Sequence, residues 1–263
     1  MYNKQKFKQT LQKWSIAIKI TPIILAIILL KILAHKFGYE VITLNALFTS
    51  LVAGTIFLIG FLISGILTDY KESEKLPSEL SASLESLYDE SYTIYKGKNS
   101  KTAKEFIKYQ KEFVNSINDW FYKKEKTQSI LDKINKMNDY FVDFEKEGVQ
   151  AGFIIKMKNE QSTLRKIILR IHTIRDTNFI ASAYAIVEAL ALAIAIGMIL
   201  IKIDPFYEAL FFTVLVTFLI TYMLFLIKDL DNPFDYYSHG ETGTEVSLKP
   251  IHDFHARIDK IKL

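Results

Sequence analysis

The stretch ALFTSLVAGTIFLIGFLISGILT, residues 46–68, is the clearest indication of the fold class of this chain. It lies inside a longer segment, between Glu40 and Asp69, in which no residue carries a charge. A helix needs about 20 apolar residues to cross the hydrocarbon core of a membrane, so residues 46–68 predict a transmembrane helix. Three further stretches meet the same criterion, at 14–35, 179–202 and 208–228. The sequence therefore predicts an all-α integral membrane protein with four transmembrane helices and a helical cytoplasmic region.

The lysines near the N-terminus set the expected orientation. Lys4, Lys6, Lys8 and Lys13 precede the first helix, whereas the connections around 36–46 and 203–207 are short and carry little charge. The positive-inside rule then places both termini and residues 69–178 in the cytoplasm. The first apolar stretch is long and no A-x-A-like site follows it, so we expect a retained helix and not a cleaved signal peptide. The expected domains are 1–68 (N-terminal segment and helices 1–2), 69–178 (cytoplasmic), 179–228 (helices 3–4) and 229–263 (cytoplasmic tail).

Residues 69–178 carry the periodicity of amphipathic helices. Apolar side chains recur every three or four residues within 106–121, 130–144 and 164–174, which predicts three helices with one buried face each. The turns between them are expected at 96–101 and 146–152. Acidic residues nearly match the basic ones here, which indicates a solvated mixed-charge surface. The aromatic stripes are interpreted as core, not as a cofactor site.

Composition and motifs exclude several classes of function. The chain has no cysteine, which rules out disulfides, iron–sulfur clusters and thiolate zinc sites. The net charge of +4 is too small to indicate binding to nucleic acid. No phosphate-binding loop, dinucleotide fingerprint, metalloprotease motif or nucleophile elbow is present. The histidines form no convincing ligand set; His252 and His255 are read as a solvated pair. We expect no enzyme activity, no metal and no cofactor.

The second transmembrane stretch has a distinctive face. Phe57 and Phe61 are four residues apart, with Ala53 one turn earlier, so the three lie on one side of the helix. Small residues elsewhere on its surface would let neighbouring helices approach closely. Either the phenylalanines face lipid, or several copies form a hydrophobic constriction that gates by dewetting. The sequence leaves these two readings open.

Glu188 is the one acidic residue within the third stretch, and Tyr184 precedes it by one turn. A lone carboxylate in lipid is costly, so Glu188 should face a bundle interior or water. Two roles are open for this intramembrane polar pair: a structural contact between helices, or part of an ion pathway.

Three stretches resemble the bestrophin family of ion channels. The first is GFLISGILTDYKESEKLPSEL, residues 60–80, where a phenylalanine-containing helix runs into a polar segment, although the double tryptophan of the family is missing. The second is the long helical insert between the second and third transmembrane helices. The third is DLDNPFDYY, residues 229–237, followed by EVSLKPIHDFHARI, residues 245–258.

This resemblance implies a homopentameric ion channel, conducting anions such as chloride, in the inner membrane of a bacterium. Ala53, Phe57 and Phe61 would line its neck. The implied partners are membrane lipid, further copies of the chain and a permeant ion. Animal relatives hold calcium with a run of carboxylates after the fourth helix; Tyr236 and residues 237–240 replace that run here, which predicts no calcium clasp.

The motif after the fourth helix has a physical role of its own. Pro233 lacks an N–H and disfavours a helical Asn232, so the helix should end there. Phe234 can then anchor the departing chain. The residues of this motif are Asp229, Asp231, Asn232, Pro233 and Phe234. Two rival functions remain: a non-conducting scaffold or sensor that binds a partner through its cytoplasmic helices, and a proton-coupled transporter that uses Glu188.

Overall fold

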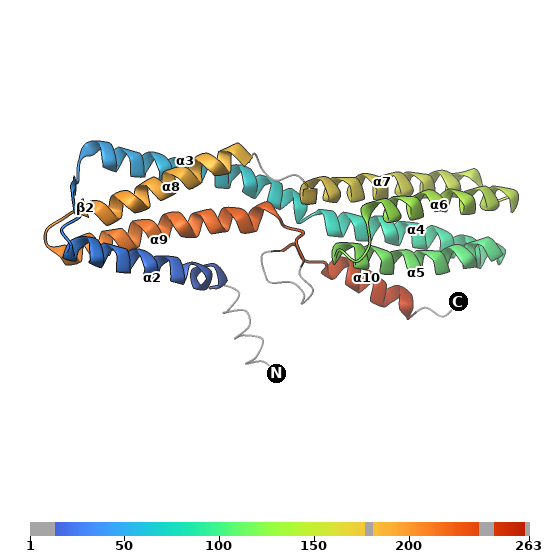
Figure 1. Cartoon of the computed structure of the whole chain (residues 1–263). Helices are drawn as coiled ribbons and strands as arrows, with labels where there is room; N and C mark the ends of the chain where they lie inside the picture. The colour runs from blue at the N-terminus through green and yellow to red at the C-terminus, as the bar shows by residue number, and fades with distance from the viewer. Residues whose placement is uncertain (1–13, 177–180, 237–244, 261–263) are drawn as a thin grey trace. The chain divides into compact units, whose positions relative to one another are not determined.

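The computed structural model describes residues 14–176, 181–236 and 245–260. Helices dominate it, and the chain divides into two compact units (Figure 1). The first unit comprises Met1–Asp69 and Asn178–Asp231, and the second comprises Tyr70–Thr177 and Asn232–Leu263.

The first unit contains the apolar helices. Among the described residues, four helices are long and apolar enough to cross a membrane, which confirms the prediction of an all-α membrane protein. They are α2 (Ser15–Lys36), α3 (Ala46–Ser73, which continues into the second unit), α8 (Ala181–Leu200) and α9 (Phe206–Asp231). Two short strands, β1 (Ile42–Thr43) and β2 (Ile201–Lys202), pair in parallel and tie the α2–α3 connection to the α8–α9 connection.

Helices α2, α8 and α9 pack against one another, and α3 contributes one side to a shared apolar core (Figure 1). Gly197 shows why a small residue is needed in α8. A Cβ at this position would lie 2.3 Å from a ring carbon of Phe48. The glycine therefore lets the aromatic ring of α3 lie directly on the α8 backbone.

The second unit is a bundle of α4 (Leu76–Lys98), α5 (Lys101–Phe121), α6 (Thr127–Lys146), α7 (Ala151–Asp176) and α10 (Lys249–Asp259). The three predicted amphipathic stripes are confirmed: their apolar residues are buried, except Ile174, which is partly buried. Helix α4 was not predicted individually, because serines interrupt its apolar stripe. Ser83 and Ser91 lie on its buried face. The Ser83 hydroxyl donates a hydrogen bond to the Glu160 carboxylate, and the Ser91 hydroxyl donates one to the Leu87 carbonyl.

Helix α5 begins at a well-formed cap. The Ser100 hydroxyl accepts a hydrogen bond from the Ala103 N–H at 2.9 Å and donates to Glu147, which also accepts from the Thr102 N–H. Burial alone would raise the pKa of Glu147, but the hydrogen bonds from Ser100 and Thr102 outweigh it and lower this pKa. The cap thus connects the α4–α5 turn to the end of α6.

The chain leaves α9 as its sequence predicts. The helix ends at Asp231, just before Asn232 and Pro233. Phe234 is fully buried in the second unit, where its ring lies 6.2 Å from that of Phe121. The Pro233 carbonyl accepts a hydrogen bond from the Val246 N–H, 2.9 Å away, so the returning chain is fixed beside it.

Candidate functional site

One face of α3 carries residues that its own chain leaves uncovered. Phe57 is 78% exposed and Phe61 is 69% exposed, and Ala53 is exposed on the same side. The opposite side of the helix is buried against α8 and α9 through Ile59, Leu62 and Ile66. Helix α3 is therefore attached along one side and open along the other.

The open face changes polarity along its length. Its members recur every three or four residues and are all exposed: Ser50, Ala53, Phe57, Phe61, Ser64 and Thr68. Hydroxyl groups thus stand at both ends, and the apolar residues lie between them. From Ala53 to Phe61 the apolar part rises about 12 Å, at 1.5 Å per residue. This order of polar and apolar residues is the one expected if the face lined a water-filled passage with a short hydrophobic constriction.

Space for close approach flanks this face. A Cβ added at Gly54 or at Gly60 would meet no atom within 4 Å. Both glycines are exposed, so a second helix could approach the α3 backbone there.

Glu188 has a partner that the sequence analysis did not identify. Its carboxylate lies 2.7 Å from the ammonium of Lys228 on α9, and both side chains are about half exposed. Tyr184, one turn earlier on α8, interacts electrostatically with Glu188 and with Asp231. The predicted pair is thus brought together, and it joins charged residues from the last turn of α9. No periodic pattern connects positions 188 and 228, so this contact could not be predicted from the sequence.

The acidic residues of the motif after α9 are distributed between different contacts. Asp229 lies 3.8 Å from the Lys19 ammonium of α2. Asp235 pairs with Lys123 in the second unit. Within the described residues, no group of three or more histidines or acids could hold a metal ion. Residues 237–240, on which the prediction about calcium partly depends, lie outside the described residues.

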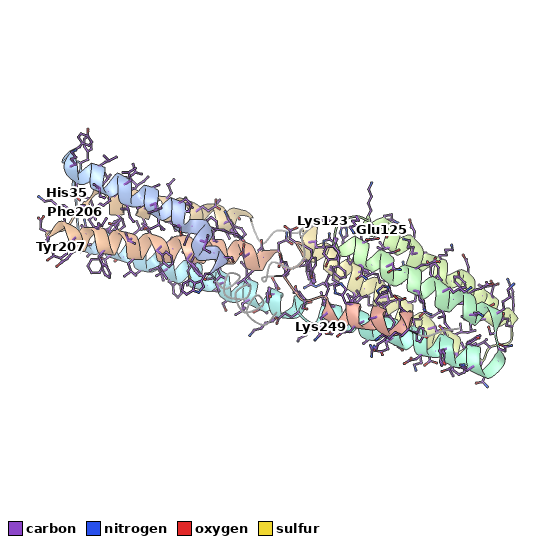
Figure 2. The ribbon with its side chains drawn as sticks, turned by 90° about the horizontal axis from the view of Figure 1, so that it is seen from below. His35, Lys123, Glu125, Phe206, Tyr207 and Lys249 are labelled. Carbon is purple, nitrogen blue, oxygen red and sulfur yellow. The ribbon has the colours of Figure 1, made fainter. Side chains whose placement is uncertain are left out.

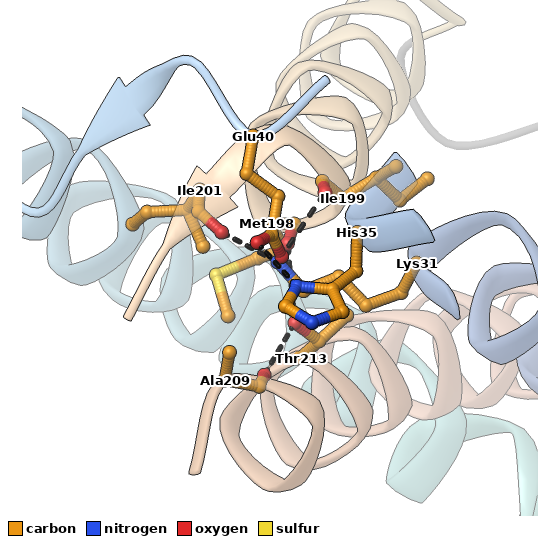
Figure 3. Close-up of polar contacts among 8 residues, drawn as sticks. All are labelled: Lys31, His35, Glu40, Met198, Ile199, Ile201, Ala209 and Thr213. Atoms are coloured by element: carbon orange, nitrogen blue, oxygen red, sulfur yellow. Dashed lines mark hydrogen bonds and ion pairs between the residues drawn. The ribbon is translucent and has the colours of Figure 1, made fainter. Parts of the chain in front are cut away.

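A buried ionic cluster at the other end of α2 was also missed (Figure 3). The Lys31 side chain is fully buried; its ammonium lies 2.7 Å from Glu40 and donates hydrogen bonds to the carbonyls of Ile199 and Ile201. His35 Nδ1 lies 2.8 Å from the second oxygen of Glu40, and its ring stacks on Phe206 at 4.0 Å. The sequence signal is Lys31 itself, a charged residue within the apolar stretch 14–35.

This cluster compensates its own charges. Burial would raise the pKa of Glu40, but hydrogen bonds from His35 and Lys31 and the charge of Lys31 outweigh it and lower this pKa. Lys31 also satisfies carbonyls where α8 ends and β2 begins, which otherwise lack helical partners. The cluster therefore joins α2, the α2–α3 connection and the end of α8.

Comparison with known proteins identifies the fold. No family model matches the chain, and no curated protein matches it. Two crystal structures of variants of a bacterial bestrophin homolog from Klebsiella pneumoniae match at 14% sequence identity, with TM-scores of 0.77 and 0.73. The alignments cover 93% and 91% of this chain and 98% and 97% of theirs. The chain therefore has a bestrophin-like fold along nearly its whole length.

Proposed function

We propose that this chain forms a homopentameric ion channel around α3, conducting anions such as chloride. The bestrophin-like fold supports this proposal, because the solved structures that share it include bacterial bestrophin homologs. Ala53, Phe57 and Phe61 of each copy would form the neck. No charged residue lies between Glu40 and Asp69, so the preference for anions rests on the resemblance to the family alone.

The observation that carries the proposal is the exposed face of α3. Serine and threonine hydroxyls at its two ends suit a water-filled path, and the two phenylalanines between them suit a constriction. Several copies around an axis would remove this face from lipid. Conduction would then be passive, and the wetting of the phenylalanine ring would act as the gate.

The pairing of β1 with β2 supports the proposed orientation. It joins the α2–α3 connection to the α8–α9 connection, so both belong on one side of the membrane. An even number of crossings then returns both termini and the second unit to the other side. The basic N-terminal segment, which lies outside the described residues, supports assigning that side to the cytoplasm by the positive-inside rule. The resemblance to the bestrophin family supports a bacterial inner membrane.

A planar-bilayer recording of the purified oligomer under a KCl gradient tests the function. Currents that require the protein, with a reversal potential set by chloride, would support an anion channel. A reversal potential set by potassium would keep the channel and overturn its selectivity. Silence from a verified, folded oligomer over a range of voltages would favour the rival function, a scaffold that binds a partner through the second unit.

A further inference from the structure

A cavity of about 610 Å³ lies where α5 ends, α6 begins and α7 ends, all within the second unit. Its lining includes Lys123, Lys126, Thr127, Leu131, His172 and Arg175 (Figure 2 labels Lys123 and the nearby Glu125). This volume falls within the usual range for small-molecule sites. The proposed channel function does not use this cavity.

Arg175 supplies a guanidinium that is in no ion pair with the described residues. Its Nη1 donates a hydrogen bond to the Trp120 carbonyl at 3.2 Å, and the group lies over the Trp120 ring, 5.1 Å from the centroid. No carboxylate among the described residues lies within ion-pairing distance of it. Burial lowers the pKa of Arg175, and this effect outweighs the attraction of the more distant carboxylates of Asp176 and Asp235. A guanidinium has five N–H donors, so donors remain for a ligand.

The start of α6 adds further donors to the same cavity. Lys126 is the N-cap residue of α6, and its side chain accepts no hydrogen bond from the first N–H groups of the helix. These N–H groups have no partner within the helix itself. Lys126 is exposed and forms no ion pair among the described residues. Thr127 is held in place by Trp120, whose Nε1 donates to its hydroxyl at 3.0 Å.

The carboxylates near the cavity already have partners. Glu125 pairs with Lys133 and accepts a hydrogen bond from Ser129 at 2.6 Å, and these hydrogen bonds lower its pKa against the effect of its burial. Asp176 lies 3.4 Å from His172 Nδ1. Among the described residues, Lys126 and Arg175 thus have no carboxylate within ion-pairing distance, and they lie next to a helix N-terminus whose dipole also favours an anion.

We propose that this cavity binds the phosphate group of a small anionic ligand. Arg175 would hold the phosphate with its planar fork, Lys126 would add a point charge, and the first N–H groups of α6 would donate to its oxygens. Leu131 and Leu169 would face the organic part of the ligand. Arg175 precedes Ala181, the first described residue of α8, by only a few positions in the sequence. The phosphate could thus belong to a phospholipid headgroup or to a soluble phosphate compound.

Two binding measurements on the full-length protein test the proposal. In nonionic detergent, inorganic pyrophosphate is titrated calorimetrically. In nanodiscs of phosphatidylcholine with phosphatidylglycerol, native mass spectrometry measures the anionic lipid that stays bound. Lys126→Gln and Arg175→Gln are compared with Lys158→Gln, which removes the charge of an exposed lysine elsewhere on α7.

We expect saturable binding in at least one of the two measurements. Both cavity variants should weaken it at least about tenfold, and the Lys158 variant should leave it unchanged. Binding of pyrophosphate indicates a soluble ligand, and retention of phosphatidylglycerol alone indicates a lipid headgroup. Absence of binding in both assays overturns the proposal, as does an equal loss in the Lys158 variant. If Arg175→Gln does not fold, Lys126→Gln decides, because Lys126 is exposed and has no ion pair to lose.

Discussion

Replacing Lys31 with methionine should destabilise the first unit strongly. The substitution keeps the length of the side chain and removes an ammonium that is 0% exposed. Glu40, whose side chain is 8% exposed, would lose its partner at 2.7 Å, and the carbonyls of Ile199 and Ile201 would lose a donor. Removing one member of a buried ion pair costs about 3–5 kcal/mol, because the other charge stays buried, and Glu40 would keep only its contact with His35.

The assay is thermal unfolding of the purified protein in detergent. A loss of that size lowers the midpoint of unfolding by roughly 6–20 °C. Lys36→Met is the matched control, since Lys36 lies on the same helix but is exposed, and its midpoint should barely change. The double variant Lys31→Met, Glu40→Leu should be more stable than Lys31→Met alone, because it also removes the stranded carboxylate.

The effect should depend on pH in a defined direction. The cluster lowers the pKa of Glu40 below its ordinary value of 4.5, so the pair contributes fully above that value. Its contribution falls as the pH drops through the lowered pKa, and the difference between the wild type and Lys31→Met should then shrink. A Lys31→Met unfolding midpoint equal to that of Lys36→Met at neutral pH would refute the reasoning. So would a double variant whose loss of stability equals the sum of the losses in Lys31→Met and Glu40→Leu.

Three further predictions follow from the contacts. The double variant Phe57→Ala, Phe61→Ala should raise single-channel conductance, because the neck widens. The control is Phe212→Ala, which truncates an exposed phenylalanine of α9. Unchanged currents in a well-assembled double variant would contradict the assignment of the neck. Ser100→Ala should lower the free energy of unfolding by about 1 kcal/mol, since the Ala103 N–H loses its hydrogen-bond acceptor. Denaturant unfolding measures this change, and an unchanged free energy of unfolding would contradict the role of the cap. Glu188→Gln should leave conduction in place, whereas loss of a pH-dependent flux would indicate the transporter instead.

The sequence predicted the helices well because their signals are local. An uncharged stretch such as 46–68 or a stripe such as 130–144 contains its own evidence, and the structure confirms both. The end of α9 was also predictable, because Pro233 acts on its immediate neighbours. Helix α4 was harder, since its buried serines resemble surface residues until their bonding partners in other parts of the unit are known.

The charged contacts could not be predicted, because they depend on distance in space. The pairs Lys31–Glu40 and Glu188–Lys228 need the packing of α2, α8 and α9 before they become visible. Local rules describe the cost of a charge in an apolar helix but do not name its partner. The sequence therefore predicted that Glu188 needs compensation and could not predict which residue supplies it.

Two helices of the first unit, α3 and α9, differ in the residues that they expose, and this difference bears on whether the open face of α3 contacts lipid or lines a pore. Helix α9 turns its threonines inward, with Thr213 and Thr217 buried, and its exposed residues in that region are large and apolar: Phe211, Phe212, Leu215, Phe218 and Leu219. That is the composition expected of a surface in contact with lipid. Helix α3 does the reverse on its open face, where Ser50, Ser64 and Thr68 are exposed around the phenylalanines. This difference between the exposed surfaces of two helices in one unit supports our proposal that the open face of α3 lies against water, with Phe57 and Phe61 at the neck.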